Sequence, residues 1–190
     1  MKTLLIVLPT LLVITSFAQS KTESPQLPID ELTKLINYTE IVQLDTSFTK
    51  NDLYLRGREW FAKAYSSSKN VIQLDEKESG KIVAKALMPV YHKSMGTNYP
   101  SGYINYTITI SFKDGRYKYE VSNFYHTGQN SIPDYGFCEA MINTTRKTLG
   151  FSYQKTFDYY LHQMDNNINN LIGNLKTSMN AITTSKNDDW

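Results

Sequence analysis

The chain has a single cysteine, Cys138, among its 190 residues. One thiol cannot form an intramolecular disulfide, so the fold must be stabilised by its hydrophobic core. Long apolar runs are also missing beyond the first eighteen residues. No later stretch approaches the roughly 20 apolar residues that a membrane-spanning helix needs. The length is that of one domain with short appendages.

An excess of charge of one sign is missing too. The sequence has 20 Lys and Arg against 18 Asp and Glu, a formal net charge of +2. A nucleic-acid partner requires a clustered basic face that neutralises phosphates. The nearly balanced composition therefore argues against nucleic-acid binding.

The first eighteen residues have the features of a secretory signal peptide. Lys2 is followed by an apolar stretch from Leu4 to Val13, and Ser16-Phe17-Ala18 fits a small-x-small cleavage site. We expect cleavage after Ala18 and export to the periplasm or outside the cell. No integral span is expected after signal removal.

Catalytic and metal-binding motifs are not found in the sequence. The three histidines have no metal-ligand spacing, and the run Asp75-Glu76-Lys77-Glu78 lacks the alternating oxygen ligands of a calcium loop. Cys138 is in no recognisable nucleophile motif. We therefore predict no catalytic residue, no metal site and no cofactor. We expect His92 and His126 in loops beside the strands. If the protein has a catalytic site assembled from loops, we expect that site near these two histidines.

The clearest structural signal is the stretch from Tyr103 to Tyr125. Apolar and polar residues alternate on both sides of Asp114-Gly115, which predicts a β-hairpin with one buried face. The expected pairs are Phe112 with Tyr117, Ile110 with Tyr119, Ile108 with Val121 and Ile104 with Tyr125. A slip of one residue would turn half of the apolar side chains to solvent.

The rest of the chain predicts a mixture of helices and strands. Thr49 and Asp52 form a capping-box pattern ahead of a helical stripe of Leu53, Gly57, Trp60, Phe61 and Ala64. Strands are expected at Tyr38–Leu44, Val71–Asp75 and Lys81–Val90, a short helical turn at Ile29–Ile36, and loops at His92–Gly102 and Thr127–Gly136. The segment Phe137–Gly150 is ambiguous.

An amphipathic helix is predicted near the C-terminus, from about Ser152 to Ala181, on the order of 45 Å long. Its apolar residues follow a 4-3 spacing: Phe157, Leu161, Met164, Ile168, Leu171, Leu175 and Ile182. This stripe can pack on a sheet, or it can pair with another copy of the chain. The expected organisation is a signal peptide (1–18), a polar leader (19–37), an α+β domain (38–128), a connecting segment (129–151) and the C-terminal helix (152–183).

The stretch from Leu53 to Ala86, followed by the Lys113-Asp114-Gly115-Arg116-Tyr117 turn, resembles a family of secreted proteins from Bacteroidetes. This family is called domain of unknown function 4468 and has a TBP-like fold. The resemblance covers about Val42 to Tyr125. It implies a curved antiparallel sheet in the order β-α-β-β-β-β-α, with helices packed on one face. It implies no activity, and a TBP-like fold does not imply DNA binding.

With no catalytic constellation, the interpretation that the sequence favours is an exported, non-enzymatic binding or scaffolding module with an unknown envelope ligand or protein partner. Its candidate surface is the polar face of the hairpin, if no helix covers it. That face consists of Asn105, Thr107, Thr109, Ser111, Lys118, Glu120 and Ser122. The alternatives are a hydrolase-like enzyme with a site near His92 and His126, and self-association through the C-terminal helix.

Overall fold

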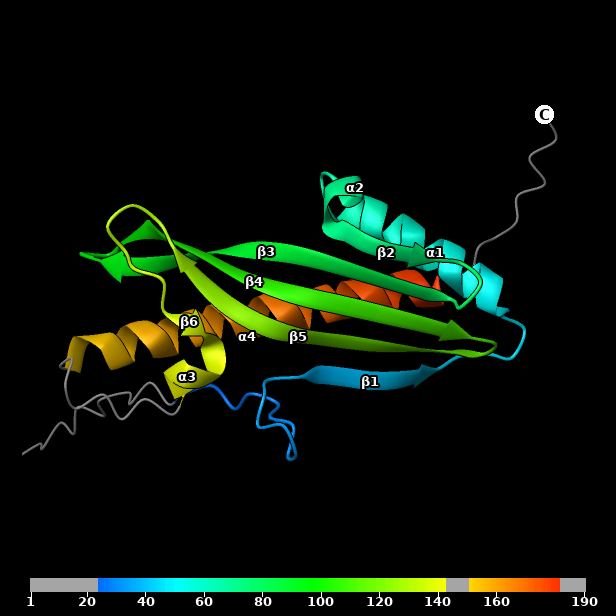
Figure 1. Cartoon of the computed structure of the whole chain (residues 1–190), viewed down its shortest axis with the longest axis horizontal. Helices are drawn as coiled ribbons and strands as arrows, with labels where there is room; N and C mark the ends of the chain where they lie inside the picture. Colours follow the sequence, from blue (N-terminus) through cyan, green and yellow to red (C-terminus); the bar gives the residue numbers. More distant parts are fainter. Residues whose placement is uncertain (1–23, 143–150, 182–190) are drawn as a thin grey trace, which may run out of the picture.

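The structure is a computed structural model that describes residues 24–142 and 151–181. The expected signal peptide lies outside these residues. One antiparallel sheet dominates the fold, with the strand order β1-β5-β4-β3-β2 and with β6 paired to β5 (Figure 1). Its strands are β1 (Tyr38–Gln43), β2 (Ile72–Glu76), β3 (Lys81–Ser94), β4 (Thr97–Lys113), β5 (Arg116–Gly128) and β6 (Gly136–Phe137). The helices are α1 (Lys50–Ala64), α2 (Ser68–Val71), α3 (Cys138–Ile142) and α4 (Phe151–Asn180).

The predicted hairpin is formed by β4 and β5. Phe112 pairs with Tyr117, Ile110 with Tyr119 and Ile108 with Val121, which confirms this part of the register. The expected pair of Ile104 with Tyr125 is wrong, because Ile104 pairs with His126. A β-bulge between Asn105 and Thr107 causes the shift. It adds one residue to β5, where Asn123 has a left-handed φ of 59°.

The predicted loop at His92–Gly102 is instead an extension of β3 and β4. The two strands continue to a tight turn at Met95 and Gly96, with His92 paired to Tyr99. Almost every side chain from Tyr91 to Pro100 is at least partly exposed on both faces of this extension. Period-two alternation arises only where one face is buried, so this hairpin left no such pattern in the sequence.

Helix α1 begins with the predicted capping box. The Thr49 side chain accepts a hydrogen bond from the Asp52 N–H, and the Asp52 carboxylate accepts one from the Thr49 N–H. The buried stripe includes Leu53, Gly57, Trp60 and Phe61 as predicted. Ala64, also expected in the stripe, is exposed at the end of the helix. The short helix α2 was not predicted.

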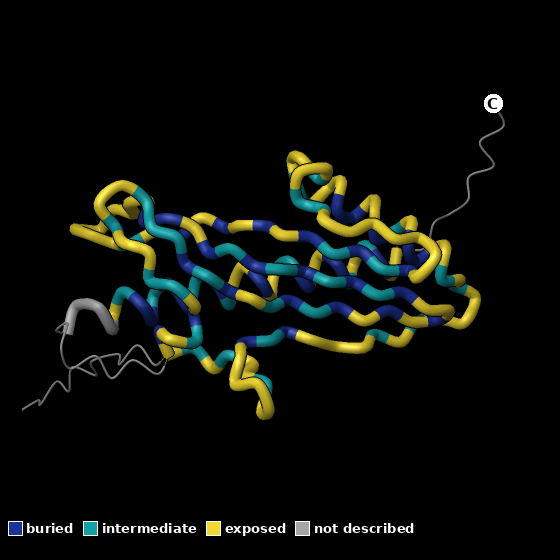
Figure 2. Tube along the Cα trace, in the orientation of Figure 1, coloured by how far each residue is buried: buried dark blue, intermediate teal, exposed yellow. Residues whose placement is uncertain are grey.

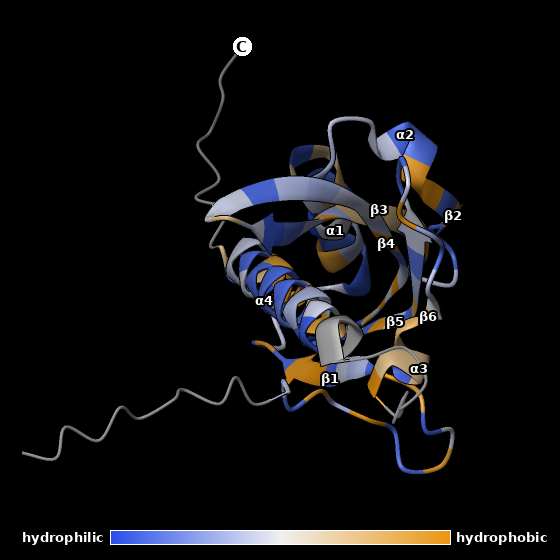
Figure 3. Ribbon diagram, turned by 90° about the vertical axis from the view of Figure 1, so that its left-hand side faces the viewer, coloured by the Kyte–Doolittle hydropathy of each residue, from blue (hydrophilic) through white to orange (hydrophobic). Residues whose placement is uncertain are grey.

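Helices α1 and α4 lie on the same side of the sheet (Figure 3). Burial alternates along β3, β4 and β5, because one side chain faces the helices and the next faces away (Figure 2). We call the side turned away from α1 and α4 the outer face. The fold is thus the predicted α+β arrangement with helices on one face of an antiparallel sheet.

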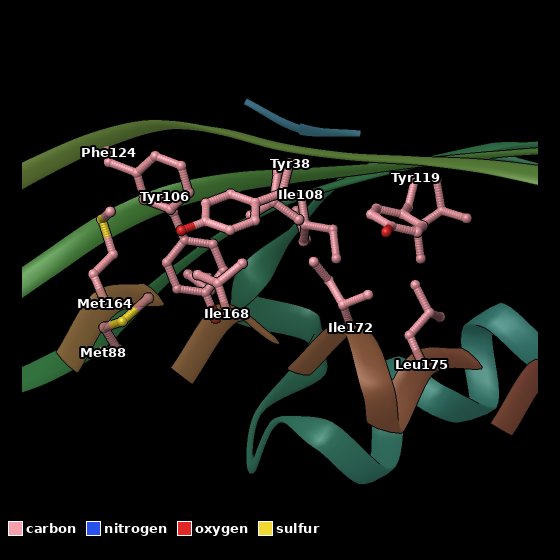
Figure 4. Packing of buried hydrophobic residues seen from close by; sticks show 14 of the residues in the cluster. Tyr38, Met88, Tyr106, Ile108, Tyr119, Phe124, Met164, Ile168, Ile172 and Leu175 are labelled. Carbon is pink, nitrogen blue, oxygen red and sulfur yellow. The ribbon is translucent and has the colours of Figure 1, made fainter. Parts of the chain in front are cut away.

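Helix α4 fills the core along the length of the sheet. Met164, Ile168, Ile172 and Leu175 point toward Tyr106, Ile108, Tyr119 and Phe124 (Figure 4). The observed stripe differs from the predicted one in its second half, because Ile172 and Met179 are buried while Leu171 is only partly buried. Ile182 lies outside the described residues. A helix in a globular core follows its period of 3.6 residues, so the stripe drifts from a strict 4-3 spacing.

The segment before β1 is more ordered than a polar leader. Residues 29–36 form a hairpin-like turn in which Ile29 and Ile36 make a β-bridge, not the expected helical turn. The N–H of Lys34 donates to the carbonyl of Asp30, and Ile36 is buried in the core. We call residues 29–36 the arm. It projects beside the start of β1 (Figure 1).

After β5 the chain forms β6 and α3 within the connecting segment. The Phe137 ring packs edge-on against Tyr125, while Cys138 and Met141 enter the core. Residues 143–150, the rest of the ambiguous stretch, are outside the described part.

Candidate functional site

The seven residues of the predicted polar face all lie on the outer face of β4 and β5. Cross-strand pairs of this face are Thr107 with Ser122, Thr109 with Glu120 and Ser111 with Lys118. Six of the seven residues are partly exposed and Lys118 is exposed. Among the described residues, neither α1 nor α4 covers this surface (Figure 3). The prediction of which residues share this face therefore agrees with the structure.

A hollow of about 640 Å³ occupies one part of the outer face. Asn105 and Thr107 form its floor together with Lys85 and Leu87 of β3. Its walls come from α2 on one side, and from Asn123 and Phe137 on the other. Leu87 is 56% exposed and Phe137 58%, so the hollow combines polar groups with two accessible apolar side chains.

The bulge in β5 shapes this hollow. Asn123 has the left-handed conformation that the bulge requires, and its side chain is exposed at the rim. On the neighbouring strand, the Asn105 amide donates to the Tyr125 carbonyl at 3.2 Å and to the Thr127 hydroxyl at 3.0 Å. Asn105 is therefore held in a fixed orientation, and such preorganisation lowers the cost of ordering a binding surface.

Charge on the outer face is mixed near the hairpin turn and basic at the hollow. Lys118 forms an ion pair with Glu120 at 3.3 Å, outside the hollow. Lys85 is the charged residue that lines the hollow, and its side chain is exposed. The hollow thus offers amide and hydroxyl groups, one cation and an apolar wall.

The sequence did not indicate the walls of the hollow. Leu87 alternates with the buried residues Ala86 and Met88, so its outward position follows from the two-residue period of the strand. Asn70, Val71 and Phe137 come from short elements that no periodic pattern marks. Sheet pairing alone brings them beside Asn105.

A second polar groove, of about 570 Å³, lies between β1 and α4. The Glu40 carboxylate accepts hydrogen bonds from Lys176 at 2.6 Å and from the Tyr119 hydroxyl at 2.8 Å, and these contacts lower the pKa of Glu40. Asp165 accepts from the Tyr38 hydroxyl at 2.7 Å. Burial, and the hydrogen bond to Asp165, raise the pKa of Tyr38. These contacts link helix and strand, whereas the buried Oδ1 atom of Asn37, which also lines the groove, has no partner among the described residues.

The histidines do not form a shared accessible site. His92 and His126 lie in β3 and β5 and not in loops, which corrects the prediction. The Nδ1 atom of His92 is 2.7 Å from the Ser101 hydroxyl, but Ser101 is completely buried. His126 is buried against the rings of Tyr135 and Tyr160, and burial lowers its pKa. A buried serine cannot reach a substrate, so this Ser–His contact does not make a nucleophile.

The remaining candidates have structural roles. Asp75 forms an ion pair with Arg58 at 3.0 Å and accepts a hydrogen bond from the Tyr54 hydroxyl. Cys138 is buried, and burial raises the pKa of its thiol, which keeps it protonated. In the described residues, no three His, Cys, Asp or Glu side chains gather in a way that could hold a metal ion. No helix of the described part is long and apolar enough to cross a membrane.

The fold and the outer face define an α+β protein of the TBP-like class, in which helices cover one face of an antiparallel sheet. Residues 38–127 match the family described as "Domain of unknown function (DUF4468) with TBP-like fold". This part of the chain is similar to the family, which confirms the resemblance seen in the sequence.

Two solved structures share the fold. One is a DUF4468 family protein from Bacteroides ovatus, with 16% identity and a TM-score of 0.59 over 82% of this chain and 92% of that one. The other is a TBP-like protein from Parabacteroides distasonis, with 15% identity and a TM-score of 0.55 over 75% of this chain and 93% of that one. The comparison with curated proteins gave no match. At these identities the likeness concerns the fold alone.

Proposed function

We propose that this protein is an exported, non-enzymatic binding module and that its ligand binds in the hollow of the outer face. The observation that carries the proposal is the hollow itself. It sits on the side of the sheet away from α1 and α4, and its floor contains the predicted residues Asn105 and Thr107. Concave sites with a few fixed polar groups and an apolar wall are the usual form of ligand sites.

The lining of the hollow favours a particular kind of ligand. Asn105 and Thr107 offer hydrogen bonds, Lys85 offers a positive charge, and Leu87 and Phe137 offer an apolar surface. A polar ligand that also has an apolar or ring face and a negative group is complementary to all three features of the lining. Acidic glycans and acidic peptides have this chemistry.

Export is part of the proposal and is supported by the first eighteen residues of the sequence. The expected mature N-terminus is Gln19. Mass spectrometry of the protein isolated from its host checks this, because retention of residues 1–18 would contradict export through a cleaved signal.

The binding test uses arrays of acidic and neutral glycans and peptides. Thr107→Glu places a negative charge in the hollow, and we expect it to weaken binding at least about tenfold, equivalent to 1.4 kcal/mol. Ser111→Glu is the matched control, since Ser111 lies four residues further along the same strand and face but outside the hollow. We expect that control to bind within about twofold of the wild type.

The enzymatic alternative is tested on the same panel. Hydrolysis of any glycan or peptide, abolished by His92→Gln with the fold intact, would overturn the non-enzymatic proposal. Equal loss of binding in Thr107→Glu and Ser111→Glu would place the ligand elsewhere on the face.

A further inference from the structure

The two edges of the sheet are protected to different degrees. Exposed edge strands tend to pair with other chains, and natural proteins prevent this with bulges, charges or proline. At the β2 edge the pairing register shifts between Ile72 and Leu74, and the strand ends in Asp75 and Glu76. Glu40 is the one charged residue of the β1 edge, which has no register shift. Its six residues, Tyr38 to Gln43, pair with β5 without interruption and include no proline or lysine.

Several aliphatic side chains are exposed around β1, beside the polar groove toward α4 and the charged residues of the arm. Ile41 points to the outer face and is 58% exposed, a large fraction for an isoleucine in a strand. The arm beside it exposes Leu32, which is 93% accessible at its tip, as well as Leu35 and Ile29. Exposed aliphatic residues that gather at one edge mark an interaction surface, whereas single scattered ones do not.

The single charge of β1 is already compensated within the chain. Glu40 accepts hydrogen bonds from Lys176 and Tyr119, on the helix-facing side of the strand. The edge therefore presents β-branched side chains with almost no net charge. A strand of the same sequence would meet no strong electrostatic repulsion there.

We propose that the β1 edge is an interface between two copies of this chain, which pair their β1 strands antiparallel about a two-fold axis. The axis of such a pair is perpendicular to the sheet, so each residue on it faces its own copy. If the two-fold axis passed through the Glu40 pair, two carboxylates would lie opposite each other, which is destabilising. Centring on Ile41 instead places two exposed isoleucines in contact and pairs Thr39 with Gln43 of the second copy.

A second copy accounts for the arm as well as for the strand. In an antiparallel pair the start of one β1 lies beside the end of the other. Each arm, which precedes its own β1, is thereby brought next to the second copy, where Leu32 can be covered. The same axis places both outer faces on one side of the pair, so the assembly leaves the hollows accessible. This interface does not depend on the ligand proposed above.

The test compares the two edges by light scattering during size-exclusion chromatography, using the chain as released by its host. Ile41→Lys places a charge on the β1 edge, and Leu74→Lys makes the matched change on the β2 edge, where Leu74 is also exposed on the outer face. We expect a dimer for the wild type and for Leu74→Lys. For Ile41→Lys we expect association weakened at least about tenfold, so that the monomer predominates. Circular dichroism verifies that both variants are folded.

A cysteine pair tests the register independently. Ile41→Cys would place two thiols opposite each other on the axis, so we expect a disulfide-linked dimer under mild oxidation. Thr39→Cys, on the same face of the same strand, faces Gln43 of the second copy and should not cross-link to itself. A wild type that remains monomeric up to about 100 μM, at the weak end of specific association, overturns the proposal. Dimers that survive Ile41→Lys, or that dissociate in Leu74→Lys instead, overturn it too.

Discussion

Gly57 of α1 lies directly against the ring of Phe112 of β4. A Cβ atom at position 57 would be 2.4 Å from the Cζ atom of Phe112, closer than two non-bonded carbon atoms can approach. The glycine thus lets the helix sit on the sheet at a point where both elements carry buried aromatic residues. A residue that weakens a helix in isolation is here a requirement of the packing.

Gly57→Ala is therefore expected to destabilise the protein although alanine is the better helix former. Overpacking of a core typically costs about 1–3 kcal/mol, which exceeds the roughly 1 kcal/mol gained in helix propensity. Gly173→Ala on α4 is the matched control, since an added Cβ there meets no atom within 4 Å. We expect it to stabilise the protein by up to about 1 kcal/mol. Urea denaturation measures both changes, and a stabilised Gly57→Ala would contradict the contact.

Asp114 of the hairpin turn is expected to stabilise α1 as well as the turn. Its carboxylate accepts a hydrogen bond from the Lys50 N–H at 2.6 Å, at the N-terminus of α1. Loss of such a capping contact usually costs about 1 kcal/mol. We predict this loss for Asp114→Ala and a smaller one for Asp114→Asn, which keeps an acceptor and suits the turn. Wild-type stability of Asp114→Ala in thermal unfolding would show that the cap contributes nothing.

Substitutions in α4 are expected to destabilise the protein most at the buried positions of the helix. Ile168 is completely buried, and truncation of such a residue to alanine typically costs about 2–5 kcal/mol. Leu171, which the sequence also placed in the stripe, is only partly buried. We predict that Leu171→Ala costs less than half as much as Ile168→Ala. Chemical denaturation of the two variants measures the difference, and a reversed order would contradict the observed orientation of the helix.

His126 is expected to make the fold sensitive to mild acid. Burial lowers its pKa below the ordinary value of 6.5, and within the described residues its Nε2 atom has no hydrogen-bond partner. The unfolded chain therefore binds a proton below pH 6.5 that the folded chain does not. The contribution of neutral His126 to the free energy of unfolding is complete above pH 6.5. It decreases as the pH falls, by up to about 1.4 kcal/mol per pH unit.

The variant His126→Phe keeps a ring packed against Tyr135 and Tyr160 but cannot be protonated. We expect the wild type to lose more free energy of unfolding than this variant between pH 7.5 and pH 5.5. Urea titrations at the two pH values provide the comparison. Identical losses would mean that His126 is accessible to protons in the folded state.

Local chemistry was sufficient to predict several elements of this protein from the sequence. The Asp114-Gly115 turn, the register near it and the Thr49–Asp52 cap each depend on residues close together in the chain. The shared face of Asn105, Thr107 and Thr109 follows from the two-residue period of a strand whose other side is buried. These features are dictated by backbone geometry and short-range hydrogen bonds, so they do not require knowledge of what packs nearby.

Only the tertiary structure decided where these elements end and what they meet. The extension of β3 and β4 around Met95 is exposed on both faces and so has no alternation to detect. The bulge at Asn123 shifts the register for Ile104, because sheet twist and strand pairing, and not local preference, determine where an extra residue is accommodated. The hollow is bounded by α2 and Phe137, which are brought to Asn105 only by the pairing of distant strands. The sequence thus determined the polar face, and long-range packing gave that face its shape.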